Sequence, residues 1–409
     1  MPTDSAAHKR SPDDHADRHL FDLREGISFE LEEVNAVLAE LIAIHADRRA
    51  KDAELLTARL GIGGAKPETL THIGTRYDLS RDRVRQLHTK AVAQLIHTAQ
   101  QAGDHVTRML SSRYPIDARD RQLVRRLLVE TYVTDTDLAA TELSYVKLRL
   151  AGHTGLDARR IAGFVSQRIA AWQKKTNRRL AKLYDAEPSD TNQLSTWLGH
   201  IDWPETPTVA TVPTSAARTA DVDDDGRGRF YLDKVGREVR FDSGLEARLL
   251  WILNTSDVVE TFQEYPVAVR YHLDGAEDWH CPSVVARLTS GRVVLIDVEA
   301  LGHVGFHVNR VKAAAGRAAA HAKGWGWLIW TGSAIGVPDM STHPVDSAST
   351  RMLHGLVARG PVRRDGLAAV RAQTGLELLD FLALVLQNDW RWDRAPFRLS
   401  APPSPTPRM

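Results

Sequence analysis

The hydrophobic pattern of this chain changes period near its middle, and that change restricts the fold more than any other feature. Before residue 204, apolar residues recur at three- and four-residue steps, for example at Leu31, Val34, Val37, Leu38 and Leu41. Such spacing is typical of amphipathic helices. After residue 228, short runs of β-branched residues appear between turn signals. The sequence therefore predicts a helical half followed by a separate α/β unit.

The order of elements in the second half follows from the same reading. We expect a helix at 244–253, strands at 267–273, 284–288 and 293–298, a helix at 308–321 and a strand at 327–331. Further helices are expected at 349–358, 366–374 and 377–386. Residues 204–228 are rich in Pro, Thr, Ala and Asp, which predicts a flexible linker. The polar segment 1–25 and the Pro-rich segment 401–409 are expected to be disordered.

The charge distribution supports two units with different partners. The net charge of the 409-residue chain is +1, yet residues 51–184 carry 24 Lys and Arg against 13 Asp and Glu, a surplus of 11. Residues 219–303 carry 9 against 16, a deficit of 7. A basic half is the natural partner of a polyanion, although the same residues also serve as a solvated surface.

Composition also limits the compartment. The chain has one cysteine, Cys281, so no intramolecular disulfide can form, and this fits a reducing cytoplasm. No apolar run approaches about 18 residues, so we expect no membrane partner. The N-terminus lacks the apolar core of a signal peptide. A cytoplasmic, nucleoid-associated protein is the expectation.

A helix-turn-helix pattern spans residues 69–91. Leu70, Ile73 and Gly74 form the inner face of a first helix, and Gly74 allows close approach of the second. Asp78 and Leu79 form the turn, and Ser80 is placed to cap a helix that begins at Arg81. That helix is buried through Val84, Leu87, Ala91 and Leu95. The alternative interpretation is an ordinary helical hairpin.

The outer face of the second helix carries the side chains that read DNA in this architecture. The candidate DNA-binding residues are Ser80, Arg81, Asp82, Arg83, Arg85, Gln86 and Lys90. Arginine matches the O6 and N7 acceptors of guanine, and glutamine matches adenine. Lys90 lies further along the helix, where a phosphate contact is expected.

The stretch RLGIGGAKPETLTHIGTRYDLSRDRVRQLHTKAVAQL resembles region four of primary bacterial sigma factors, the part that recognises promoters. The glycine-rich segment before the first helix, the Ile-Gly pair and the SRDRVRQ start of the second helix carry the resemblance. It implies that Arg81, Asp82, Arg83, Arg85 and Gln86 occupy positions that read promoter bases. The chain does not resemble a complete sigma factor.

The α/β unit carries acidic residues on separate segments. Glu246 belongs to the predicted helix 244–253, Ser283 precedes a strand, and Asp297 and Glu299 end the next one. Carboxylates on a helix and on neighbouring strands are how nucleases hold Mg²⁺ or Mn²⁺, which activates water and stabilises the phosphate transition state. If the site is active, Glu246, Asp297 and Glu299 would hold the ion.

The element order and these motifs resemble the catalytic domain of TnsA-like transposon endonucleases, within the wider PD-(D/E)xK restriction-endonuclease-like fold. The resemblance covers about 241–332. The family's Pro-Asp pair stands here as Pro282-Ser283, and its (E/Q)xK motif as Asp297-Val298-Glu299. A metal-binding aspartate and the catalytic lysine are therefore replaced. The resemblance implies a nuclease-fold module with degenerate catalytic motifs.

The expected organisation is multidomain. An all-α half contains a helix-turn-helix domain at 26–104 and a basic helical domain at 105–203. After the linker come a restriction-endonuclease-like α/β domain at 229–335 and a helical C-terminal region at 336–400.

The leading hypothesis is a sequence-specific protein of double-stranded DNA that acts by binding. One alternative is an active metal-dependent endonuclease, either a transposase subunit or a defence nuclease. Another is a transcription regulator that contacts RNA polymerase. A transposase or another DNA-processing protein remains a further candidate partner.

Overall fold

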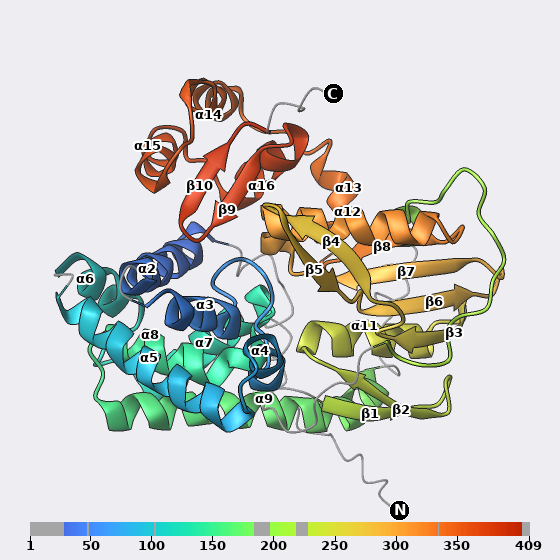
Figure 1. Cartoon of the computed structure of the whole chain (residues 1–409), viewed down its shortest axis with the longest axis horizontal. Coiled ribbons are helices and arrows are strands. Elements are labelled where there is room, and N and C mark those ends of the chain that lie inside the picture. The colour runs from blue at the N-terminus through green and yellow to red at the C-terminus, as the bar shows by residue number, and fades with distance from the viewer. Residues whose placement is uncertain are drawn as a thin grey trace, which may run out of the picture.

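The computed structural model describes residues 28–46, 49–101, 104–183, 197–217, 228–333 and 335–402. A helical half, an α/β region and a C-terminal region with short helices follow one another along the chain (Figure 1). The multidomain fold class predicted from the sequence is confirmed. The segment 1–25 and residues 403–409, which we expected to be disordered, lie outside the described residues.

The helical half packs around one large core and a smaller one at the helix-turn-helix. Its helices are α2 (Phe29–Ala46), α3 (Ala50–Leu60), α4 (Leu70–Tyr77), α5 (Arg81–Gln101), α6 (Asp104–Arg113), α7 (Asp120–Thr134), α8 (Ala140–Leu150) and α9 (Gly155–Leu183). Leu38, Leu56 and Leu95 are among the residues buried between them. The long helix α9 runs beneath the others in Figure 1 and packs against α7 and α8. A short 3-10 turn, Asp137–Ala139, connects α7 to α8.

A four-stranded sheet forms the centre of the α/β region. Its order is β3 (Val259–Glu264), β6 (Val284–Leu288), β7 (Val293–Val298) and β8 (Gly326–Trp330). The pairs β3–β6 and β6–β7 are antiparallel, whereas β7 and β8 are parallel. The helix α12 (His307–His321) connects the parallel pair, as such a pair requires.

The sheet is covered on both faces. The helix α11 (Gly244–Thr255) shares a core with alternate strand residues, including Ala286 and Ile296. The other face, including Val285 and Leu295, shares a core with Ala320 of α12. This burial on both faces explains why β7 reads VVLIDV with almost no polar residue.

The first strand of the sheet differs from the prediction. The run 267–273 contributes β4 (Val269–Leu273), which pairs with β5 (Ala276–His280) in a separate hairpin. The sheet instead begins at β3, an edge strand whose VETFQE sequence is too polar to stand out. Tyr265, with φ 47°, and the following Pro266 redirect the chain between β3 and β4.

The boundary of the α/β region also lies earlier than expected. Trp197 and Ile201 belong to the core of α11 and the sheet rather than to the helical half. Asp202 exchanges two backbone hydrogen bonds of 2.9 Å with Trp327 of β8. Thr208, in the predicted linker, donates its backbone N–H to Gly324 O. The described part of that linker is thus packed against the sheet, with Ala210 and Val212 on the face that α12 covers, while residues 218–227 lie outside the described residues.

Two further hairpins complete the molecule. The strands β1 (Gly228–Leu232) and β2 (Arg237–Phe241) pair beside α11. The C-terminal region holds α13 (Val337–Met340), α14 (Ser347–Arg359), α15 (Arg364–Thr374) and α16 (Leu378–Gln387), as well as the unpredicted hairpin of β9 (Arg391–Arg394) and β10 (Phe397–Ser400). Phe29 of α2 belongs to the C-terminal core, so the two ends of the described chain pack together (Figure 1).

Candidate functional site

The helix-turn-helix is formed by α4, a short turn and α5. Thr69 caps α4, because its Oγ1 accepts a hydrogen bond of 3.0 Å from His72 N. Asp78 takes a left-handed conformation with φ 54° and ends the helix. Ser80 Oγ then accepts from Arg83 N at 3.3 Å at the start of α5, as the sequence predicted. Ile73 and Val84 close a small core between the two helices.

Gly74 is required by the turn between these helices. A Cβ atom at this position would lie 2.5 Å from the backbone oxygen of Leu79 and 3.6 Å from Val84 Cγ2. Leu79 N also donates to Gly74 O at 2.8 Å. The close approach predicted at Gly74 therefore involves the turn more than the second helix itself.

All seven candidate DNA-binding side chains are exposed on one end of α5. They are Ser80, Arg81, Asp82, Arg83, Arg85, Gln86 and Lys90. Arg85 Nη2 lies 3.3 Å from Asp82 Oδ1, and Arg83 Nη1 donates to Gln86 Oε1 at 3.3 Å. Such exposed contacts contribute little to stability, so these side chains are free to exchange them for a ligand.

The inner face of α5 contains a buried polar side chain, His88. His88 is 6% exposed, and burial lowers its pKa to about 4, so the imidazole is neutral at neutral pH. Nearby, the buried Arg59 donates to Glu142 Oε1 at 2.6 Å and to Glu68 O at 3.1 Å. This pair links α3 to α8 and to the segment that precedes α4.

Residues 50–97 match the family model described as Sigma-70, region 4. The match extends from the start of α3 through most of α5 and covers 48 of 409 residues. The resemblance to sigma region four is confirmed for this segment. The chain carries a sigma-like DNA-binding helix-turn-helix.

Acidification is expected to loosen the sigma-like helix-turn-helix through His88. The unfolded imidazole binds a proton below about pH 6.5, whereas the folded one resists it down to about pH 4. The stability contributed by the neutral His88 is therefore fully present above the unfolded pKa, and it is lost as the pH drops between these two values. The loss between pH 7 and pH 5 should be about 2 kcal/mol. Hydrogen exchange of the α5 amides at both pH values measures it.

His88→Leu removes the titrating group and serves as the comparison. In this variant the free energy of opening of the α5 amides should change with pH by about 2 kcal/mol less than in the wild type. An identical pH dependence in both proteins would show that His88 is not the group that titrates.

Of the four candidate positions in the α/β region, Glu246 and Ser283 share a hydrogen bond. Glu246, on α11, is 4% exposed. Its Oε1 accepts from Ser283 Oγ at 2.9 Å, and its Oε2 accepts from Tyr265 OH at 2.7 Å and from Asp242 N at 2.8 Å. Its acceptor positions are thus largely taken by neighbouring donors of the protein.

Asp297 and Glu299, at the end of β7, have different partners. Asp297 Oδ2 lies 2.6 Å from His280 Nε2; burial raises the pKa of Asp297, but His280 outweighs this and holds it below its ordinary value. Burial raises the pKa of Glu299 to about 7. Its Oε1 lies 3.6 Å from Nδ1 of His303, a residue that is only 2% exposed.

Lys66 is the member of this cluster that sequence reasoning missed. It comes from the segment between α3 and α4, and its Nζ lies 3.3 Å from Asp135 Oδ2 and 3.5 Å from Glu246 Oε1. Burial lowers the pKa of Lys66, but the carboxylates of Asp135 and Glu246 outweigh it, so the pKa lies above its ordinary value. The side chain is therefore a permanent cation.

The cluster as arranged does not suit a divalent metal ion. Within the described part of the chain, no group of three His, Cys, Asp or Glu side chains has the arrangement that holds a metal. Ser283 Oγ donates to Glu246 Oε1, and the ammonium of Lys66 lies 3.5 Å from the same oxygen. The predicted ligands Glu246, Asp297 and Glu299 thus have other partners here.

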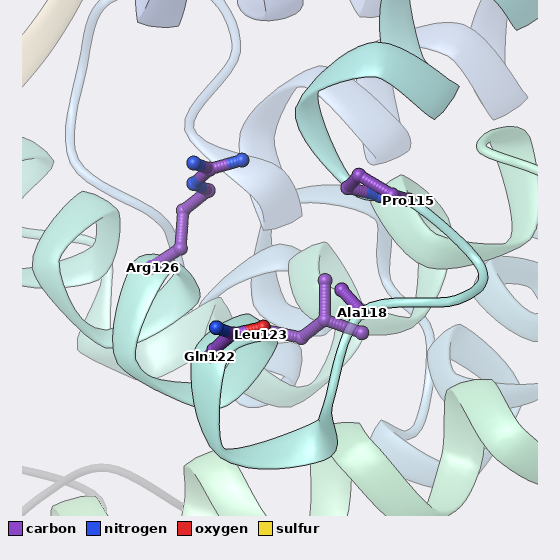
Figure 2. Close-up of a pocket in the computed structure, with 5 residues that line it drawn as sticks. All are labelled: Pro115, Ala118, Gln122, Leu123 and Arg126. Atoms are coloured by element: carbon purple, nitrogen blue, oxygen red, sulfur yellow. The ribbon is translucent and has the colours of Figure 1, made fainter.

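A surface hollow of about 290 Å³ lies apart from both sites. It is lined by Pro115, Ala118, Gln122, Leu123 and Arg126, at the start of α7 and in the loop before it (Figure 2). None of these residues belongs to the helix-turn-helix or to the carboxylate cluster.

Among the described helices, none is long and apolar enough to cross a membrane.

Proposed function

We propose that this protein binds a specific double-stranded DNA sequence through the exposed end of α5. The observation that carries the proposal is the set of arginine, glutamine and lysine side chains that a sigma-like helix-turn-helix holds in solvent. In this architecture the second helix enters the major groove. Arg81, Arg85 and Gln86 supply the groups that distinguish base pairs, and Lys90 is placed for a phosphate.

We further propose that the α/β region is a nuclease-fold module of the TnsA-like kind that acts by binding rather than by cleavage. Its support is the order of α11, three antiparallel strands, α12 and a parallel strand. Ser283 and Glu299 replace the aspartate and lysine on which that chemistry depends. A module of this kind would contact DNA or a partner protein once the helix-turn-helix has found its site.

The test uses the full chain and a pool of random duplexes. Repeated selection should enrich one sequence, which should bind about 1,000-fold or more tightly than random duplex. Affinity for both should fall as salt rises, because phosphate contacts release counterions. If no sequence is enriched, or if single strands bind equally well, the proposal fails.

A second candidate is a transcription regulator, and the family match favours it. Sigma region four acts in promoter recognition, so a protein with this module is a candidate partner of RNA polymerase. Purification of the tagged protein with and without DNA digestion tests this idea. Core polymerase that remains bound after digestion supports the regulator, whereas its loss on digestion means that DNA alone joins the two.

A further inference from the structure

The segment between α3 and α4, residues 61–69, joins the helix-turn-helix to the rest of the molecule. Gly64 O accepts a hydrogen bond of 3.0 Å from Asn309 Nδ2 of α12. A Cβ atom on Gly64, whose φ is 97°, would lie 2.9 Å from the ring of Phe306. The segment therefore approaches α12 so closely that only glycine fits at this point.

This approach carries the ammonium of Lys66 to carboxylates from both halves of the chain. Asp135 follows α7 of the helical half, whereas Glu246 belongs to α11 of the α/β region. Lys66 Nζ lies 3.3 Å from the first and 3.5 Å from the second. One cation thus connects three segments that are remote in the sequence.

A further contact fixes the same junction. Asp137 Oδ2 accepts from Gly244 N at 2.6 Å, at the N-terminus of α11. Val133 of α7 also belongs to the apolar core beneath α11. The end of α7 and the start of α11 are therefore held together whether or not Lys66 is present, and this fixes the distance between Asp135 and Glu246.

Several buried carboxylates lie around Lys66. Asp135 is 4% and Glu246 4% exposed, and Asp297 and Glu299 lie near enough to act on Lys66. Glu299 Oε1 and both ring nitrogens of His303 lack hydrogen-bond partners among the described residues. Buried carboxylates need a compensating cation. Lys66 supplies it.

We propose that Lys66, whose side chain is 30% exposed, is a cation that locks the helix-turn-helix onto the α/β region and keeps divalent metal ions out of the carboxylate cluster. The ammonium and a divalent ion would compete for Glu246 Oε1. This proposal rests on the contacts of Lys66 and not on DNA reading, so either can fail alone.

The first experiment titrates Mn²⁺ into the full chain by calorimetry. Lys66→Met removes the charge and keeps the length of the side chain, and Lys51→Met, at an exposed position of α3, is the matched control. Lys66→Met should bind Mn²⁺ about tenfold or more tightly than the wild type, because the Lys66 ammonium no longer competes for Glu246 Oε1. Adding Glu246→Gln should abolish the gain. Equal binding by Lys66→Met and Lys51→Met would overturn the proposal.

A double-mutant cycle tests the lock by a second measurement that does not depend on metal binding. Thermal unfolding is compared for Lys66→Met, Asp135→Asn and the double variant. The lock predicts that the second substitution shifts the Tm less in the presence of the first than alone. Additive shifts would show that the two side chains do not act together, and the lock would be rejected.

A nicking assay separates the lock from catalysis by Lys66. A plasmid is incubated with wild type and Lys66→Met in Mg²⁺ and in Mn²⁺. The lock predicts that the wild type nicks no faster than Lys66→Met. Nicking by the wild type that Lys66→Met abolishes would instead make Lys66 the lysine of a working endonuclease, and the lock would be discarded.

Discussion

Replacing Glu130 with alanine should destabilise the helical half by about 3 to 5 kcal/mol, the range found when a buried ion pair loses one partner. Glu130, on α7, is 3% exposed. Its Oε1 accepts from Arg113 Nε at 2.7 Å, and its Oε2 accepts from Lys147 Nζ at 2.8 Å and from Tyr114 OH at 2.7 Å. Alanine would leave two cations and a buried hydroxyl without their acceptor.

The charge of Glu130 is secured by these partners. Burial raises the pKa of Glu130, but Lys147 and Arg113 outweigh it and hold the pKa below its ordinary value. The stabilisation is present above the unfolded pKa and is lost only as the pH falls through the lower folded value. At neutral pH the effect of the substitution is therefore at its full size. Thermal unfolding and hydrogen exchange of the α7 and α8 amides measure it.

The same arginine provides a matched control. Arg113 Nη1 also donates to Glu30 Oε2 at 2.8 Å, but the side chain of Glu30 is 76% exposed. Glu30→Ala breaks a surface pair and should cost no more than about 1 kcal/mol. If Glu130→Ala and Glu30→Ala lower the Tm equally, the buried network does not hold α6, α7 and α8 together.

Local patterns were sufficient to predict the helix-turn-helix and most elements of the α/β region. The cap at Ser80, the turn at Asp78 and Leu79, the close approach at Gly74 and the periodic apolar residues all act over a few residues, so the sequence displays them directly. The spacing of the motif residues also indicated the resemblance of this segment to sigma region four. The exposed end of α5 followed because its polar residues lie opposite Val84 and Ala91.

Elements whose stability depends on remote partners were missed. The strand β3 reads as polar, and its place in the sheet depends on pairing with β6. The hairpin of β9 and β10 is held through Arg394, which donates to Glu32 of α2 over 362 residues. Nothing in the short sequence VETFQE or RWDR indicates those partners.

The carboxylate cluster illustrates the same limit at a candidate site. Glu246 and Ser283 were singled out from a family pattern, and they do form a hydrogen bond. Lys66 lies 180 residues before Glu246 and belongs to the sigma-like motif, where no local signal assigns it to another domain. Only the contacts of the segment 61–69 with Glu246 of α11 and with the start of α12 bring it there. The cation beside Glu246 thus comes from a segment that is remote in the sequence.

Substitutions on α5 should separate base reading from phosphate binding once the preferred duplex is known. Arg85→Ala should weaken binding to that duplex by about 1 to 3 kcal/mol, or roughly 5- to 150-fold, and relax the preference at one base pair. Lys90→Ala should weaken selected and random duplex alike and reduce the salt dependence by about one counterion. Fluorescence anisotropy across a salt series measures both.

The structural reason for the contrast is the position of each side chain on an otherwise rigid helix. Arg85 and Lys90 are both exposed, and the ion pair of Arg85 with Asp82, at 3.3 Å, is exposed as well, so neither substitution should disturb the fold. Arg229→Ala, on the exposed face of β1, is the control for lost positive charge and should leave the selectivity unchanged. If Arg85→Ala and Lys90→Ala weaken binding to all duplexes by the same factor, α5 contacts only the DNA backbone. Sequence recognition must then lie elsewhere in the chain.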